Sequence, residues 1–162
     1  MDAFFIFCAR YLHVFSIMLA LIFLLTQQSK VRSKIVLYAC VCLVLSYLIA
    51  LVIGHLFYNP RPFVEHHFKP LVEHEVENGL PSHHALLVSS IAVIITRFNK
   101  RLAILFWIFA LFVGIARVYV GVHHAVDVAT SFLISISVGI IASADALKNS
   151  VNSIAVIQDK SK

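Results

Sequence analysis

The chain has 162 residues, of which 60% are hydrophobic and 13% are charged, and its mean hydropathy is +0.92. A chain this apolar is typical of a membrane protein and not of a water-soluble domain. The formal net charge of +5 gives no sign of nucleic-acid binding, because the basic residues gather at the ends of apolar segments.

Five apolar segments account for this composition. A transmembrane helix needs about 20 apolar residues to cross about 30 Å of hydrocarbon. No internal repeat is evident, and the remaining residues are too few for a soluble domain. We therefore predict an all-α fold, a single integral membrane domain over residues 1–162 built as a polytopic helical bundle of about five transmembrane helices. The predicted spans are residues 3–26, 35–58, 84–98, 102–122 and 125–147.

The first segment has two interpretations. A cleaved signal peptide would need a basic start, but the chain opens with Met1 and Asp2, and no small-residue cleavage pattern follows the apolar run. We therefore expect a mature helix. Arg10 and His13 interrupt it. Either they face the bundle interior, or the spanning part begins near Tyr11 and Arg10 extends to the interface.

Basic and acidic residues divide between the two sides of the bundle. Basic residues lie between the first and second spans, between the third and fourth, and after the last, whereas acidic residues predominate in the loop over residues 59–81. The positive-inside rule places the basic connections in the cytoplasm and this loop outside. The basic residues are Lys30, Arg32, Lys34, Arg97, Lys100, Arg101, Lys148, Lys160 and Lys162, and the acidic ones are Glu65, Glu73, Glu75 and Glu77.

The outer ends of the spans carry an unusual set of polar residues. An ionisable group at the centre of a membrane helix costs about 2.5 to 3.5 kcal/mol on insertion scales, so a cluster of such groups needs a functional reason. The first stretch ends the second span with Arg61 held between Pro60 and Pro62. The prolines keep this segment extended and aim the guanidinium. The ordinary alternative is an arginine that simply reaches the interface.

The second stretch opens the third span with Pro81, Ser82, His83 and His84. Ser82 can cap the helix or donate its hydroxyl, and the free N–H groups of a helix N-terminus bind phosphate oxygens. The two histidines are about 100° apart on a helix, so at most one points directly at a ligand. Taken alone, a histidine pair at an interface is also a common polar anchor.

The third stretch joins the fourth and fifth spans. We expect Gly121 to end one helix, and His123 and Asp127 to share a face of the next one at a spacing of four. A carboxylate there can fix the imidazole tautomer and leave the other nitrogen free to attack; alternatively, the pair only caps the helix. Arg117 needs an anion, which is either a bound phosphate or Asp127 itself.

Together the three stretches resemble the PAP2 superfamily of type 2 phosphatidic acid phosphatases, whose motifs are K-x6-R-P, P-S-G-H and S-R-x5-H-x3-D. The resemblance covers about residues 54–127 with their flanking spans; it implies a motif core over about 54–147 and a cytoplasmic tail over 148–162. Three positions depart from the motifs: Gly54, His83 and Ala116 stand where the lysine, glycine and serine are expected. The segment from Tyr58 to Ser82 is similar to the bacitracin-resistance type of undecaprenyl diphosphate phosphatase. The chain has one span fewer than the usual six.

The resemblance implies a metal-independent phosphatase without a cofactor. His123 would attack the terminal phosphorus, Asp127 would orient it, and His84 would protonate the leaving oxygen and later activate water. The substrate would be a phosphorylated membrane lipid, with undecaprenyl diphosphate as the first expectation and phosphatidylglycerophosphate, phosphatidic acid or lipid A as alternatives. The enzyme would lie in a bacterial inner membrane with its site on the periplasmic or outer face. The substrate-binding residues would be Arg61, Arg117, Ser82 and His83.

A non-enzymatic alternative is a histidine-rich membrane protein that binds or transports metal through the outer loop. Its candidate ligands lack tight ligand spacing. A haem-binding bundle is a further alternative, but axial histidines would face each other inside the membrane, whereas His84 and His123 lie near one end beside arginines. The loop residues concerned are His66, His67, His74, Glu73 and Glu77.

Overall fold

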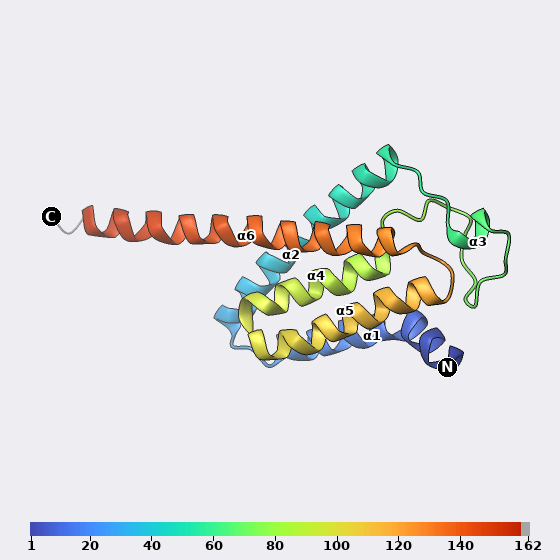
Figure 1. Cartoon of the computed structure of the whole chain (residues 1–162). Coiled ribbons are helices and arrows are strands. Elements are labelled where there is room, and N and C mark those ends of the chain that lie inside the picture. Colours follow the sequence, from blue (N-terminus) through green and yellow to red (C-terminus); the bar gives the residue numbers. More distant parts are fainter. Residues whose placement is uncertain (160–162) are drawn as a thin grey trace.

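The computed structural model describes the backbone of residues 1–159 and the side chains of residues 1–144. Within these residues it contains helices and loops and no strand, so the all-α prediction is confirmed. Figure 1 shows α4, α5 and α6 side by side, α2 running obliquely across them, and the loop between α2 and α4 gathered at one end. The helices are α1 (Asp2–Leu25), α2 (Ser29–Leu56), α3 (Pro62–Glu65), α4 (His83–Phe98), α5 (Lys100–Tyr119) and α6 (Ala125–Asp159).

Four helices are long and apolar enough to cross a membrane: α1, α2, α5 and the part of α6 over Ala125–Ala144. The predicted third span corresponds to α4, which has 16 residues and is therefore about 24 Å long. Nine of these residues are buried, and α4 packs against α1, α2, α5 and α6. The protein is thus a multi-pass helical bundle in which the shortest apolar helix lies at the centre.

Two helix boundaries show how local sequence shapes the bundle. Asn99 separates α4 from α5, and its side chain accepts a hydrogen bond from the backbone N–H of Leu102 at 3.0 Å, which is a standard N-cap. Because this turn is so short, α4 and α5 form an antiparallel hairpin. At the other end of the chain, α6 continues past residue 147, where the sequence predicts the last span to end. The predicted tail over residues 148–162 lies outside the residues whose side chains are described.

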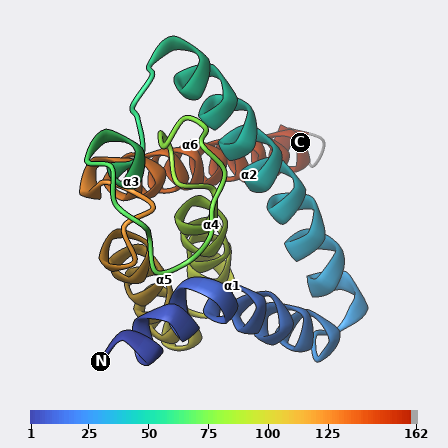
Figure 2. The ribbon, with the colours of Figure 1, turned by 90° about the vertical axis from the view of Figure 1, so that its right-hand side faces the viewer.

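The helix α2 diverges from α1 after their short connection, and the two enclose an open angle over α4 (Figure 2). A cavity of about 290 Å³ lies between α1, α2 and α4. Its lining is entirely apolar and includes Leu21 and Phe23 of α1, Leu43 of α2, and Leu87 and Ile91 of α4. The bundle therefore has a partly open apolar pocket of the kind that accepts part of a hydrocarbon chain.

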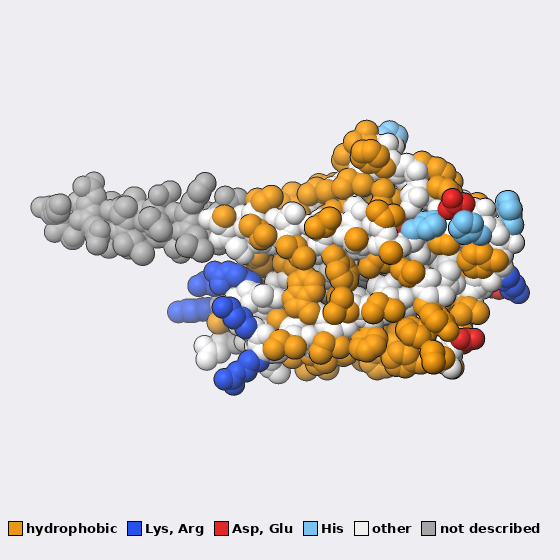
Figure 3. Space-filling view, viewed as in Figure 1, with side chains coloured by type: hydrophobic (Ala, Val, Ile, Leu, Met, Phe, Trp, Pro, Cys, Tyr) orange, Lys and Arg blue, Asp and Glu red, His pale blue; other side chains and the backbone are white. Residues whose placement is uncertain are grey.

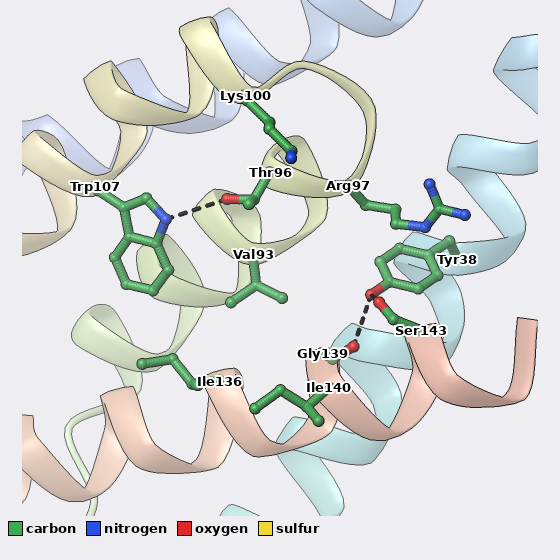
Figure 4. A pocket seen from close by; sticks show the side chains of 10 residues that line it. All are labelled: Tyr38, Val93, Thr96, Arg97, Lys100, Trp107, Ile136, Gly139, Ile140 and Ser143. Carbon is green, nitrogen blue, oxygen red and sulfur yellow. Dashed lines mark hydrogen bonds between the residues drawn. The ribbon is translucent and has the colours of Figure 1, made fainter. Parts of the chain in front are cut away.

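The two ends of the bundle differ in charge. Lysines and arginines gather at the end that carries the α1–α2 and α4–α5 connections, whereas histidines and acidic side chains gather at the other end (Figure 3). A cavity of about 480 Å³ at the basic end is bordered by Arg97 and Lys100. Figure 4 shows it between α4, α5 and α6, beside Tyr38, whose hydroxyl donates to the Gly139 carbonyl. All three polar stretches lie at the opposite end.

Candidate active site

Three segments meet at the histidine-rich end of the bundle: the α2–α4 loop, the first turn of α4 and the α5–α6 connection. Backbone hydrogen bonds join them, including Leu71 N–H to the Val120 carbonyl at 3.1 Å and Ser82 N–H to the Asp127 carbonyl at 3.3 Å. Five residues that the sequence analysis singled out are at most 4% exposed here. They are Arg61, Ser82, Arg117, His123 and Asp127.

The α5–α6 connection makes a tight turn at Gly121, which has φ +81°; a Cβ there would lie 2.6 Å from the Phe68 ring. Only glycine suits both the backbone conformation and the contact. The turn leaves His123 in the connection, two residues before α6 begins at Ala125. The expectation that His123 lies on the helix is therefore wrong. The predicted pairing is nevertheless present, because Nδ1 of His123 lies 3.3 Å from Oδ2 of Asp127.

Two neighbours determine the tautomer of His123. Asp127 as a carboxylate can only accept, so Nδ1–H of His123 donates to it. Nη1 of Arg61 can only donate, and it lies 3.1 Å from Nε2 of His123. Nε2 therefore presents its lone pair. Burial lowers the pKa of His123, although the hydrogen bond to Asp127 opposes the shift, so the imidazole is neutral near pH 7 and Nε2 is a potential nucleophile.

Asp127 is fully buried and accepts two further hydrogen bonds. Oδ1 accepts from Nδ2 of Asn59 at 2.7 Å, and Oδ2 accepts from the backbone N–H of His124 at 2.9 Å. Among the described residues, no carboxylate lies within ion-pair distance of Arg117. The alternative in which Asp127 neutralises Arg117 is therefore wrong.

Asparagine side chains hold the α2–α4 loop in place. Oδ1 of Asn78 accepts from the backbone N–H groups of Asn59 and Leu80 at 2.9 and 3.0 Å, and its Nδ2 donates to the carbonyls of Gly54 and Phe57 at 2.7 and 2.9 Å. Nη2 of Arg61 donates to the Asn78 carbonyl at 3.3 Å. The sequence analysis missed Asn59 and Asn78 as site residues. Their positions beside Pro60 and Gly79 signal turns, but they do not reveal these partners.

Several buried donors at this end have no partner among the described residues. They are Nε of Arg61, Nε and Nη2 of Arg117, and the hydroxyl of Ser82. A buried guanidinium without an anion is unfavourable. Two arginines and a serine hydroxyl with unused donors therefore provide a site for an anion with several acceptor oxygens, such as phosphate.

The two motif histidines at the start of α4 occupy different environments. His84 is half-buried, and its ring packs edge-on against His13 of α1 with centroids 4.6 Å apart. His83 is exposed, with its ring centroid 6.2 Å from that of Tyr47. The pair thus diverges, as the helical spacing predicts. The assignment of His83 to substrate binding stays a prediction.

The loop histidine His74 was considered in the sequence analysis only as a metal ligand. Its ring centroid lies 5.9 Å from that of His123, and its buried Nδ1 has no partner in the described part of the chain. Its pKa is lowered to about 4, first by burial and then by the charges of Arg61 and Arg117. His74 is therefore a neutral neighbour of His123 at pH 7.

The structure gives the metal-binding alternative no support. Among the described side chains, no group of three or more His, Cys, Asp or Glu residues is placed to hold a metal ion. The position that carries lysine in the motif also has a structural explanation. A Cβ at Gly54 would lie 3.0 Å from the Leu80 carbonyl oxygen, so glycine lets α2 approach the loop closely. His55, the ionisable residue next to this position, is exposed.

Comparison with known proteins agrees with this geometry. The chain is 34% identical over 131 residues to the bacitracin transport permease protein BcrC of Bacillus licheniformis, covering 80% of this chain and 64% of that protein. It is 32% identical over 143 residues to the undecaprenyl-diphosphatase BcrC of Bacillus subtilis, covering 86% of this chain and 72% of that one.

Solved structures show the same architecture. Aquifex aeolicus LpxE superposes with a TM-score of 0.73 at 25% identity, over 88% of this chain and 85% of LpxE. The model of the PAP2 superfamily matches residues 35–150, a range that contains Arg61, Ser82, Arg117, His123 and Asp127. The matched range thus includes every buried residue of the site, and the chain belongs to the PAP2 superfamily.

Proposed function

We propose that this protein is a membrane phosphatase that removes the terminal phosphate of a lipid diphosphate, most specifically undecaprenyl diphosphate, through a phosphohistidine at His123. The observation that carries the proposal is the neutral, buried imidazole of His123. Its Nε2 lone pair lies 3.1 Å from a guanidinium nitrogen of Arg61, next to the unused donors of Arg117 and Ser82.

In the first half-reaction, Nε2 of His123 attacks the terminal phosphorus and the bond to the bridging oxygen breaks. The lipid monophosphate leaves, and His84 supplies a proton to the leaving oxygen. Nη1 of Arg61 turns from Nε2 to a phosphate oxygen, which is the stronger acceptor. Asp127 keeps its hydrogen bond to Nδ1–H and stabilises the positive charge that develops on the ring.

In the second half-reaction, water attacks the phosphohistidine. His84 takes a proton from the water, the phosphorus–nitrogen bond breaks, and inorganic phosphate and neutral His123 result. One group thus serves as acid and then as base. These steps use side chains of the described site alone, which is the basis for proposing metal independence.

The choice of a lipid substrate is supported by the surroundings of the site. It lies at one end of an apolar bundle, at the end opposite the basic connections, which we assign to the outer face of a bacterial inner membrane. The apolar pocket of about 290 Å³ between α1, α2 and α4 lies deeper in the bundle, toward the basic end, where it can take the far part of a long hydrocarbon tail. The undecaprenyl tail itself is proposed from the relative in Bacillus subtilis that is named undecaprenyl-diphosphatase.

Release of inorganic phosphate by the purified protein tests the proposal. We expect hydrolysis of undecaprenyl diphosphate in excess chelator, and a higher kcat/KM for it than for phosphatidylglycerophosphate, phosphatidic acid or lipid A. His123→Ala should abolish turnover, and the wild-type protein quenched in alkali should carry phosphate on nitrogen. Turnover by His123→Ala would refute the mechanism. A preference for another lipid would refute only the choice of substrate.

A further inference from the structure

A cavity of about 520 Å³ opens beside Arg117, whose buried donors in the proposed phosphate site have no partner among the described residues. Its lining includes Arg117 and His84, which belong to the motifs. It also includes Arg10 of α1 and His74 of the α2–α4 loop, which no motif contains. The cavity thus extends from the proposed site to the helix that precedes the part of the chain matched by the family model.

Arg10 is an unexpected residue in an apolar helix. Its side chain is exposed, its neighbour Ala9 is fully buried, and no carboxylate among the described residues lies within 4.0 Å of it. Glu73 and Glu75 also line the cavity and, like Arg10, are exposed to solvent, which screens the attraction between them. A cation in this position is available to an anion that occupies the cavity.

Two further residues that line this cavity, His74 and Arg117, carry unused hydrogen-bonding groups. Nδ1 of His74 and both Nε and Nη2 of Arg117 are buried and without partners. The ring of His74 lies against His123, with centroids 5.9 Å apart. A group next to a phosphate that is attacked by His123 would therefore lie in a cavity that His74, Arg117 and Arg10 line together.

We propose that this cavity binds the second phosphate of the lipid diphosphate, the phosphate that stays on the lipid, and that Arg10 is its main cationic partner, with His74 as a hydrogen-bonding partner. The inference rests on the proposed function and extends it to the leaving group. It also gives a role to the charged residue that interrupts α1. Of the two residues that interrupt α1, His13 packs against His84 of α4, whereas Arg10 lines the cavity and is exposed.

The proposed roles of Arg10 and His84 differ in the kind of leaving group that each one assists. When the bond between the terminal phosphorus and the bridging oxygen of the diphosphate breaks, the leaving group is a phosphate monoester, whose second pKa is about 6. Such a leaving group is a weak base, so its departure depends less on the proton from His84 and more on a cation that neutralises its charge. A phosphate monoester substrate instead releases an alcohol, whose pKa is close to that of water and far above that of a phosphate monoester, so its departure needs the proton from His84.

The test compares two substrates that share one tail, an isoprenyl diphosphate and the corresponding isoprenyl monophosphate, with release of inorganic phosphate as the readout. We expect Arg10→Gln to lower kcat/KM for the diphosphate about 10- to 100-fold, the range for loss of one charge-assisted hydrogen bond, with little change for the monophosphate. Arg10→Lys should restore part of the loss. Lys69→Gln, which removes one exposed charge from the same end, is the matched control and should affect neither substrate.

The outcomes separate the inference from the function on which it rests. Equal losses on both substrates, or no loss on either, would overturn the role of Arg10 while leaving the phosphatase intact. Monophosphate hydrolysis by Arg10→Gln also shows that the variant is folded. If the wild-type protein hydrolysed neither substrate, the proposed function itself would fail, and this inference with it.

Discussion

Replacement of Asp127 by asparagine tests the electrostatic part of the mechanism. The side chain keeps its shape, and an amide oxygen at the Oδ2 position can still accept from Nδ1–H of His123 and from the backbone N–H of His124. The variant loses the negative charge, and Nδ2 of Asn59 loses its acceptor. The variant therefore separates the role of the carboxylate charge from its role in positioning His123.

The expected magnitude follows from the distance between the groups. Two unit charges 3.3 Å apart, the separation of Nδ1 of His123 and Oδ2 of Asp127, attract each other by about 5 kcal/mol at an effective dielectric constant of about 20. This attraction exists only once the ring becomes positive during attack. We therefore expect kcat to fall by up to roughly 10³- to 10⁴-fold, with KM nearly unchanged.

Steady-state and single-turnover phosphate release with an isoprenyl diphosphate would measure this effect. Asn59→Ala is the matched control, because it removes the hydrogen bond at 2.7 Å to Oδ1 but leaves the charge. We expect it to lower kcat by roughly tenfold, as for one hydrogen bond to a charged group. If Asp127→Asn retained more than a tenth of the wild-type kcat, the carboxylate would only be a cap for the α6 turn, and the reasoning would be refuted.

Three further predictions concern the site and its orientation. Arg117→Ala should lower kcat/KM by about 10²- to 10³-fold, as for loss of one oxyanion donor; near-normal kcat/KM in steady-state kinetics would remove Arg117 from the phosphate site. Because burial lowers the pKa of His123 below its ordinary 6.5, kcat/KM, corrected for substrate ionisation, should stay on its plateau at pH 6.5 and fall only in more acidic solution. A half-maximal value above pH 6.5 would contradict this. In cysteine-free protein in intact cells, an impermeant thiol reagent should label a cysteine introduced within residues 65–78 and not one at position 99; reversed labelling would overturn the assigned orientation.

Much of the architecture is encoded locally and could be predicted from the sequence. Apolar runs about as long as a bilayer is thick determine membrane helices, and the unequal distribution of basic residues determines which connections share a side. The family is identified by the order and spacing of five residues within three short motifs: Arg61, Ser82, Arg117, His123 and Asp127. Each motif lies within a few residues of a helix end. Successive spans cross the membrane in opposite directions, so the end of the second span, the start of the third and the connection between the fourth and fifth all lie on the same side. The sequence therefore also predicts that the motif residues lie at one face of the bundle.

The partners within the site depend on contacts between segments far apart in the chain, and only the tertiary structure decided them. Asp127 has Asn59 as its partner and not Arg117, because the α2–α4 loop folds over the α5–α6 turn. Arg10 and His74 line one cavity with Arg117 because α1 packs against α5 and the loop covers both. In a membrane bundle, helix length and charge specify which segments span and how they are oriented, but side-chain packing between helices specifies which polar groups meet.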